Sequence, residues 1–95
     1  MTPKSKEATN YYAYMLRCAD GTIYSGYTTA PTRRTAVHNS GRGAKYTRSR
    51  LPVKLVFTER FSTKSEALKR EAALKRLSHA DKLSLIKQSA YLIKE

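Results

Sequence analysis

The stretch YYAYMLRCADGTIYSGYT, residues 11–28, decides the fold because it has the pattern of a β-hairpin. Residues 11–18 are rich in tyrosine and apolar side chains, which is typical of a strand. Asp20 and Gly21 follow, and this pair favours a tight turn because glycine tolerates a positive φ. Residues 22–28 have the composition of the returning strand. The stretch therefore predicts two antiparallel strands joined by a short turn.

The length of the turn decides which side chains of the hairpin meet. A two-residue turn would place Arg17 opposite Tyr24. A three-residue turn, with the glycine as its left-handed residue, instead places Leu16 opposite Tyr24. It also places Tyr14 opposite Gly26, which leaves room beside the tyrosine for a bulky partner. This second register brings three tyrosines to one face of the hairpin, namely Tyr12, Tyr14 and Tyr24.

A helix is predicted to follow the hairpin. Thr29 can cap it, and Pro31 is tolerated in its first turn. The helix is expected to run to about Asn39 and to end in NSGRG, where Gly41 or Gly43 can supply a left-handed cap. Its apolar content is low, so contacts other than an apolar face must hold it.

The next segments are a basic loop and a third strand. The loop covers residues 42–52, RGAKYTRSRLP, and carries one aromatic residue. Residues 53–60, VKLVFTER, alternate as a strand does. The alternation predicts that Val53, Leu55 and Phe57 lie on one face.

Two further helices complete the chain. Ser62 or Thr63 begins the first, which continues to residue 77, and Ser78 forms a capping box with Asp81 at the start of the second, residues 79–93. We expect the second to pack on the body through Leu83, Ile86 and Ala90. The order β-β-α-β-α-α predicts an α+β fold, a small three-stranded, mainly antiparallel sheet flanked by three helices. We expect a flexible tail over residues 1–9 and one domain over residues 10–90, with the last helix running to about residue 93.

Composition narrows the class of partner. Nineteen lysines and arginines against seven acidic residues give a net charge of +12 and a pI near 10.1, a balance that favours a nucleic-acid partner. A single cysteine, Cys18, excludes an internal disulfide and a cysteine-built zinc site. No apolar run approaches the roughly 18 residues that a membrane span needs. The first ten residues are polar and do not have the pattern of a signal peptide, so we expect a cytoplasmic protein.

The first helix carries two residues with chemistry on one face. Arg34 and His38 are four residues apart, which places them one turn apart on a helix. An arginine there can bind a phosphate oxygen, and a histidine can move a proton near neutral pH. The same spacing is also common on solvated helix faces.

The second helix places a carboxylate on its apolar stripe. Glu71 lies three residues from Leu68 and three from Leu74, so it falls on the stripe of Ala67, Leu68, Leu74 and Leu77. An inward carboxylate is costly unless it is paired or bound to a metal. Two interpretations remain open at this point. One is a buried salt bridge, for example to Arg34, and the other is a ligand for a hard divalent cation.

Taken together, these residues resemble the GIY-YIG nuclease domain. The first triplet of that pattern appears as Tyr12-Ala13-Tyr14 and the second as Tyr24-Ser25-Gly26, with nine residues between them. Arg34, His38 and Glu71 follow in the family's order. The resemblance covers roughly residues 11–77, and HNSGRGAKYTR and SEALKREAALK look most like the small stand-alone bacterial proteins of the UPF0213 type. Both segments are also similar to the GIY-YIG domain of eukaryotic structure-selective nucleases.

This sequence departs from the family pattern in the first triplet, which keeps only its tyrosine, and at Ser25 in the middle of the second. The departures fall at positions that look structural in the family. No added DNA-binding domain and no downstream asparagine of the family pattern can be placed. The resemblance therefore implies activity without strong sequence specificity.

The resemblance implies a metal-dependent phosphodiesterase. One Mg²⁺ or Mn²⁺ ion would be bound by Glu71. Tyr14 is the first choice for the base that activates water, and Tyr24 is the second. Arg34 would stabilise negative charge on the phosphate, and His38 would position or relay the proton. Because a tyrosine with a pKa near 10 is a poor base, nearby cations, Arg34 and the metal, are expected to lower its pKa.

The basic loop after the first helix would hold the substrate. Lys45 and Tyr46 are expected to line the groove, and Arg42, Arg48 and Arg50 to contact phosphates without reading sequence. We expect a monomer that acts on DNA in preference to RNA, as a structure-selective or weakly specific endonuclease, with a protein partner as one source of specificity. The alternatives are a basic nucleic-acid-binding module that keeps this frame but has little catalysis, and a ribosome-associated structural protein.

Overall fold

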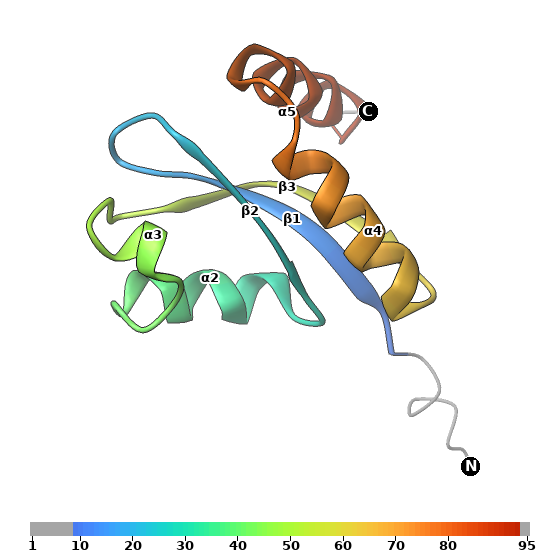
Figure 1. The fold of residues 1–95 in the computed structure, drawn as a ribbon, viewed down its shortest axis with the longest axis horizontal. Helices are drawn as coiled ribbons and strands as arrows, with labels where there is room; N and C mark the ends of the chain where they lie inside the picture. Colours follow the sequence, from blue (N-terminus) through green and yellow to red (C-terminus); the bar gives the residue numbers. More distant parts are fainter. Residues whose placement is uncertain (1–8, 94–95) are drawn as a thin grey trace.

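The computed structural model describes residues 9–93, with side chains to residue 89. It is an α+β fold in which one three-stranded sheet lies between two layers of helices (Figure 1). The strands are β1 (Tyr11–Arg17), β2 (Ile23–Thr28) and β3 (Lys54–Phe61), in the order β2-β1-β3, and both neighbouring pairs are antiparallel. The helices are α2 (Pro31–Asn39), α3 (Lys45–Arg48), α4 (Lys64–Lys75) and α5 (His79–Ile93). Residues 1–8 of the expected tail lie outside the described residues.

The hairpin has the three-residue turn. Leu16 pairs with Tyr24, and Tyr14 pairs with Gly26, as the second register predicts. Gly21 adopts φ 88°, and Asp20 closes the turn by accepting from the Thr22 hydroxyl at 2.6 Å. The left-handed glycine and the aspartate side chain together set the register, which places Tyr14 and Tyr24 on one face of the sheet.

The two faces of the sheet have different cores. One face packs with α4 and α5 around Ala13, Met15, Ile23, Phe57, Leu74 and Ile86. The other faces α2 and α3 and gathers Tyr14, Leu16, Cys18 and Val53, with Tyr24, Leu51 and Leu55 against them. Figure 1 shows the two helix layers on opposite sides of the strands. The tyrosines therefore lie on the α2 side.

A β-bulge in β3 overturns one prediction. Met15 pairs with Phe57, whereas the next residue, Leu16, pairs with Leu55, so Val56 is the extra residue. The bulge reverses the alternation of β3. Phe57 consequently packs in the α4 and α5 core, while Leu55 packs on the tyrosine face, and the prediction that they share one face is wrong.

Helix α2 is held mainly by polar contacts. Its N-cap is Ala30, whose N–H donates to Thr28 Oγ1 at 3.1 Å, so the predicted cap at Thr29 is wrong. At the other end Asn39 makes two bonds with the backbone of Val53, accepting at 2.7 Å and donating at 3.0 Å. Gly41, at φ 86°, supplies the left-handed cap. These bonds anchor an apolar-poor helix to β3.

The basic segment predicted as a loop contains the short helix α3. Its Thr47 side chain is fully buried, and its hydroxyl donates to the Ala44 carbonyl at 2.9 Å. Four residues are too few to show a helical period, so the pattern gave no signal for this helix.

The last two helices begin where their caps predict. Glu66 N–H donates to Thr63 Oγ1 at 3.2 Å, and Asp81 N–H donates to Ser78 Oγ at 3.0 Å. Leu68, placed on the inward stripe by the sequence, is instead 39% exposed, because α4 buries the line through Ala67 and Leu74. The Ala90 side chain lies outside the described residues. Over the described part of the chain, no helix is both long and apolar enough to cross a membrane.

Candidate active site

Tyr14 lies at the centre of the tyrosine face and is 1% exposed. Its ring extends over Gly26, where a Cβ atom would come within 2.6 Å of both Cζ and the hydroxyl oxygen of the tyrosine. The space that the sequence predicts beside Tyr14 is therefore filled by its own phenol. Gly26 is required because the Tyr14 ring crosses the edge strand β2 at this residue, and any side chain here would displace the ring.

The Tyr14 hydroxyl is hydrogen-bonded to a buried histidine. Its oxygen lies 2.9 Å from His38 Nε2, and His38 Nδ1 lies 2.8 Å from Thr47 Oγ1. Because the Thr47 hydroxyl donates to the Ala44 carbonyl, it accepts from Nδ1–H, which leaves Nε2 to accept the Tyr14 proton. The Ala44 amide also approaches Nδ1, at 3.4 Å, and that contact would favour the other tautomer. We assign the proton to Nδ1 because the Thr47 bonds are shorter.

Thr47 and Gly43 also belong to this site, although the sequence suggested Gly43 only as a helix cap and gave Thr47 no role. A Cβ atom at Gly43 would overlap the His38 ring. Thr47 is 0% exposed and orients that ring. A signal was present in the sequence, since both residues lie in the segment HNSGRGAKYTR on which the resemblance partly rests.

Electrostatics keep both partners of this bond neutral. The pKa of Tyr14 is raised above 10.0, mainly because the side chain is buried. Arg34 lowers this pKa, whereas the charges of Tyr24 and Glu71 raise it further. Burial, followed by the positive charge of Arg34, lowers the pKa of His38 below 6.5. The expected lowering of the tyrosine pKa by Arg34 is therefore present, but burial outweighs it. A neutral histidine can accept the proton of a neutral tyrosine.

Tyr24 completes an aromatic cluster with Tyr14 and His38. Its ring centroid lies 6.3 Å from that of Tyr14 and 5.2 Å from that of His38. Tyr46 of α3 stacks on its outer side, at 6.0 Å and 27°. The structure therefore brings together Tyr14, Tyr24 and His38, with the half-buried Arg34 close enough to act on two of them.

Glu71 reaches this cluster from another layer of the fold. Helix α4 contacts β2, the edge strand over which the Tyr14 hydroxyl lies, and the charge of Glu71 acts on that hydroxyl. The Glu71 side chain is 20% exposed, and its Oε2 lies 3.1 Å from Lys75 Nζ. Its partner is thus the lysine one turn along α4, and not Arg34, the partner suggested for a salt bridge.

The residues around Glu71 suit a hard divalent cation, such as Mg²⁺, that needs only one or two protein carboxylates. Among the described residues no three or more His, Cys, Asp or Glu side chains gather into a metal-binding group. Mg²⁺ nevertheless commonly takes one or two carboxylates and completes its shell with water and phosphate oxygens. A single half-buried carboxylate suits that mode of binding, provided that Lys75 releases it.

The predicted phosphate contacts differ in their surroundings. Arg42, Lys45 and Arg48 are exposed around α3. Arg50 is more constrained, since its guanidinium lies 3.9 Å from the centroid of the Tyr46 ring and its Nε lies 3.1 Å from Asp20 Oδ2. Its Nη1 also donates to the Tyr46 carbonyl at 2.7 Å. In this structure Arg50 ties α3 to the hairpin turn.

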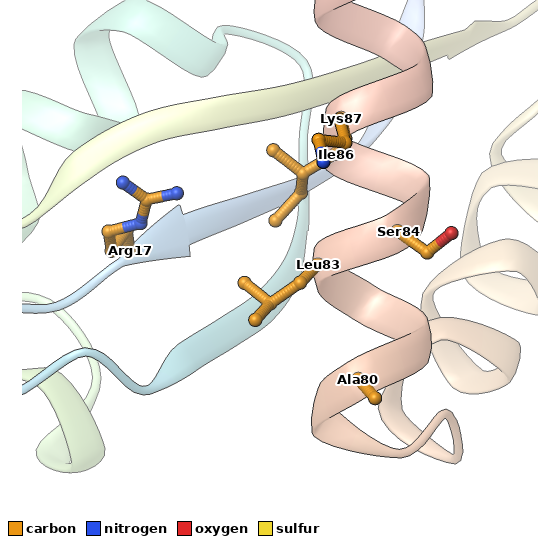
Figure 2. Close-up of a pocket in the computed structure, with 6 residues that line it drawn as sticks. All are labelled: Arg17, Ala80, Leu83, Ser84, Ile86 and Lys87. Atoms are coloured by element: carbon orange, nitrogen blue, oxygen red, sulfur yellow. The ribbon is translucent and has the colours of Figure 1, made fainter.

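A separate hollow of about 590 Å³ lies between Arg17 and helix α5 (Figure 2). Arg17 faces helix α5 across it, and the remaining lining residues all belong to α5: Ala80, Leu83, Ser84, Ile86 and Lys87. Among the described residues, its lining includes none of the candidate site residues and no carboxylate, histidine or tyrosine that could move a proton. The chemistry therefore places the candidate site on the tyrosine face.

Comparison with known proteins assigns the family. Residues 10–84 match the model of the GIY-YIG catalytic domain. A UPF0213 protein of Natronomonas pharaonis is 56% identical over 79 residues, which cover 83% of this chain and 93% of the relative. A UPF0213 protein of Streptococcus agalactiae is 54% identical over 77 residues, which cover 81% of this chain and 88% of the relative.

Two solution NMR structures are similar to this one. One is a UPF0213 protein from Bacillus halodurans, with 48% identity and a TM-score of 0.54. The other is a protein from E. faecalis, with 51% identity and a TM-score of 0.56. Each match covers 83% of this chain and 84% of the other. With most of its length matched by the family model and by relatives at about half identity, this chain belongs to the GIY-YIG nuclease family.

Proposed function

We propose that this protein is a divalent-metal-dependent endonuclease that hydrolyses phosphodiester bonds of DNA. The observation that carries the proposal is the buried hydrogen bond between Tyr14 and His38. The charge of Arg34 acts on both side chains and that of Glu71 on Tyr14. A protein that only binds nucleic acid needs neither a buried proton-accepting histidine nor a half-buried carboxylate on α4. Membership of the GIY-YIG family supports the nuclease class.

Tyr14 and His38 would activate the attacking water as a pair. A neutral tyrosine has no charge with which to take a proton, but its hydroxyl already donates toward His38 Nε2. As water attacks phosphorus, its proton passes to the Tyr14 oxygen while the tyrosine's own proton moves to Nε2. Thr47 holds the ring in the tautomer that this transfer needs.

Arg34 and Glu71 would stabilise the charge that develops on the phosphate. The guanidinium of Arg34 lies near the Tyr14 hydroxyl and can donate to a phosphate oxygen. Glu71 would hold one Mg²⁺ or Mn²⁺ ion, which supplies Lewis-acid stabilisation when it is bound. Lys75 neutralises the carboxylate until then.

The exposed cations around α3 would hold the backbone of the substrate. Arg42, Lys45 and Arg48 are exposed cations suited to phosphate oxygens, and contacts to phosphates do not read sequence. This supports selectivity for the shape of a branched or single-stranded substrate rather than for a sequence.

A cleavage assay tests the proposal directly. Flap, branched, single-stranded and duplex DNA, with RNA equivalents, would be incubated with Mg²⁺ or Mn²⁺. We expect Glu71→Gln and Tyr14→Phe each to reduce the rate by at least about 100-fold, because each removes a group that acts in the transition state. Tyr12→Phe and Glu66→Gln are matched controls from the same strand and the same helix, and they should keep the wild-type rate.

Two outcomes would contradict the proposal. A wild-type protein that binds these substrates and never cuts them is a nucleic-acid-binding module. Equal cleavage by Glu71→Gln and wild type would remove Glu71 from the mechanism.

A further inference from the structure

A second hollow, of about 250 Å³, adjoins the candidate site at the outer edge of β2. It is lined by Ile23, Tyr24, Ser25, Tyr46, Lys75 and Lys82. We propose that it is a phosphate subsite, which binds a phosphodiester group of the nucleic acid next to the one that is cleaved. The inference rests on the proposed function, because it assigns this hollow to the same substrate strand.

The charge of the hollow suits an anion. Lys75 comes from the last turn of α4 and Lys82 from the start of α5, so each of two helices contributes a lysine to the wall of the hollow. Lys82 is half-buried, and no ion pair to it occurs within the described residues. No carboxylate is among the described residues that line the hollow. A lysine that is partly removed from water without an acidic partner is stabilised when a phosphate binds beside it.

Ser25 provides an independent indication that the hollow can bind a ligand. The residue is 3% exposed, and its hydroxyl oxygen has no hydrogen-bond partner among the described residues. A buried hydroxyl without a partner costs free energy, which a bound oxygen atom or a bridging water can recover. Strand β2 is also an edge strand, so its outer backbone groups are not used by a neighbouring strand of the described sheet.

The distance from the catalytic residues suits a neighbouring phosphate. Glu71 and Lys75 are one helical turn apart on α4, about 6 Å along its axis. Tyr24 belongs to both the aromatic cluster and the wall of the hollow. A strand whose scissile phosphate lies at Glu71 and Tyr14 would therefore place its next phosphate at Lys75 and Lys82.

Lys75 links the two places. Its ammonium group pairs with Glu71, and the residue also lines the hollow. When a phosphate enters the hollow, Lys75 can exchange the carboxylate for the phosphate, which frees Glu71 to bind a cation. Substrate and cation would thus favour each other's binding, as reciprocal coupling between sites requires.

Binding measured without metal tests the subsite. Fluorescence anisotropy of a labelled single-stranded DNA oligonucleotide in EDTA would compare wild type with Lys82→Gln. We expect Lys82→Gln to weaken binding about tenfold and to reduce the slope of log K against log salt by about 1. Lys69→Gln on α4 and Lys87→Gln on α5 remove the same charge outside the hollow, and each should change affinity by less than about twofold. Equal weakening by all three variants would show that only the overall charge matters and would overturn the subsite.

Amide chemical shifts locate the contact. Titration of a thymidine tetranucleotide into the wild-type protein in EDTA should shift the amides of residues 23–25 and of Lys82, and these shifts should be lost in Lys82→Gln but kept in Lys87→Gln. Shifts confined to residues 42–48 would overturn the proposal. The titration involves no cleavage, so it tests the subsite separately from the endonuclease function. An inactive protein that shows the expected shifts would refute the endonuclease function and support the subsite. An active protein that lacks the shifts would support the endonuclease function and refute the subsite.

Discussion

At the scale of single residues, one phenol oxygen determines what the candidate site can do. Tyr14 is buried by the sheet and bonded to His38, and the ring of His38 is in turn held by Thr47. Each of these three side chains has a polar atom whose partner is another member of the set. The proton acceptor of the site is therefore defined by a threonine that would not itself touch the substrate.

Replacing Thr47 by valine tests this dependence. The change keeps the shape of the side chain but leaves Nδ1–H of His38 without its acceptor, so the favoured tautomer is lost. We expect the cleavage rate to fall by about tenfold and the free energy of unfolding to fall by about 1–3 kcal/mol, measured by urea denaturation. Thr47→Ser keeps the hydroxyl and should restore most of the rate. If serine rescues no better than valine, the hydroxyl has no part in positioning the histidine.

At the scale of elements, the candidate site draws on several segments of the fold. The hairpin would supply the tyrosines, α2 would supply Arg34 and His38, and α4 would supply Glu71 from the opposite layer. Helix α2 can be apolar-poor because Asn39 bonds it to the backbone of β3. The bulge in β3 places Phe57 in the core beneath α4 and α5, whereas Leu55 packs on the tyrosine face.

The lysine pair on α4 and α5 makes a prediction at this scale. Lys75→Gln removes the ammonium group that competes with a cation for Glu71. We therefore expect Mn²⁺, titrated without nucleic acid and followed calorimetrically, to bind Lys75→Gln more tightly than wild type by about threefold to tenfold. Lys82→Gln leaves the pairing of Glu71 intact and serves as the control. Unchanged Mn²⁺ affinity in Lys75→Gln would mean that Lys75 does not guard the carboxylate.

At the scale of the whole molecule, the sheet separates stability from chemistry. The face under α4 and α5 holds an apolar core, whereas the face under α2 and α3 buries a histidine, a threonine and a tyrosine. The chain as a whole carries a net charge of +12. Folding therefore has to keep a titratable imidazole neutral inside a strongly basic protein.

This requirement makes stability depend on pH. The pKa of His38 in the folded protein is lowered below its ordinary value of 6.5, because burial and Arg34 disfavour the imidazolium. Below pH 6.5 the unfolded chain therefore binds a proton that the folded chain does not. The free energy of unfolding should be fully maintained above that pH and should decrease as pH falls through the folded pKa.

Urea denaturation between pH 7.5 and 5, with His38→Gln as the comparison, measures this effect. The wild-type protein should lose stability toward pH 5, and the variant should lose less, because it lacks the titrating group. His79→Gln, which changes the exposed histidine at the start of α5, should follow the wild type. Parallel curves for wild type and His38→Gln would assign the pH dependence to other groups.

The sequence by itself determined the features that depend on neighbours in the chain. The pair Asp20-Gly21 located the hairpin turn, although only the structure chose between its two registers, and the caps at Thr63 and Ser78 placed two helix starts. The ordered set from Tyr12 to Glu71 indicated the family. These features follow from φ preferences, local hydrogen bonds and spacing, which act over a few residues.

Only the tertiary structure decided the features that depend on distant partners. The bulge at Val56, the helix around Thr47, the burial of the Tyr14–His38 bond and the pairing of Glu71 with Lys75 are examples. The hollow that gathers Lys75 and Lys82 beside Ser25 is another. Each depends on which groups are excluded from water together, and that is settled by the packing of α2 and α4 on the sheet and not by any local pattern.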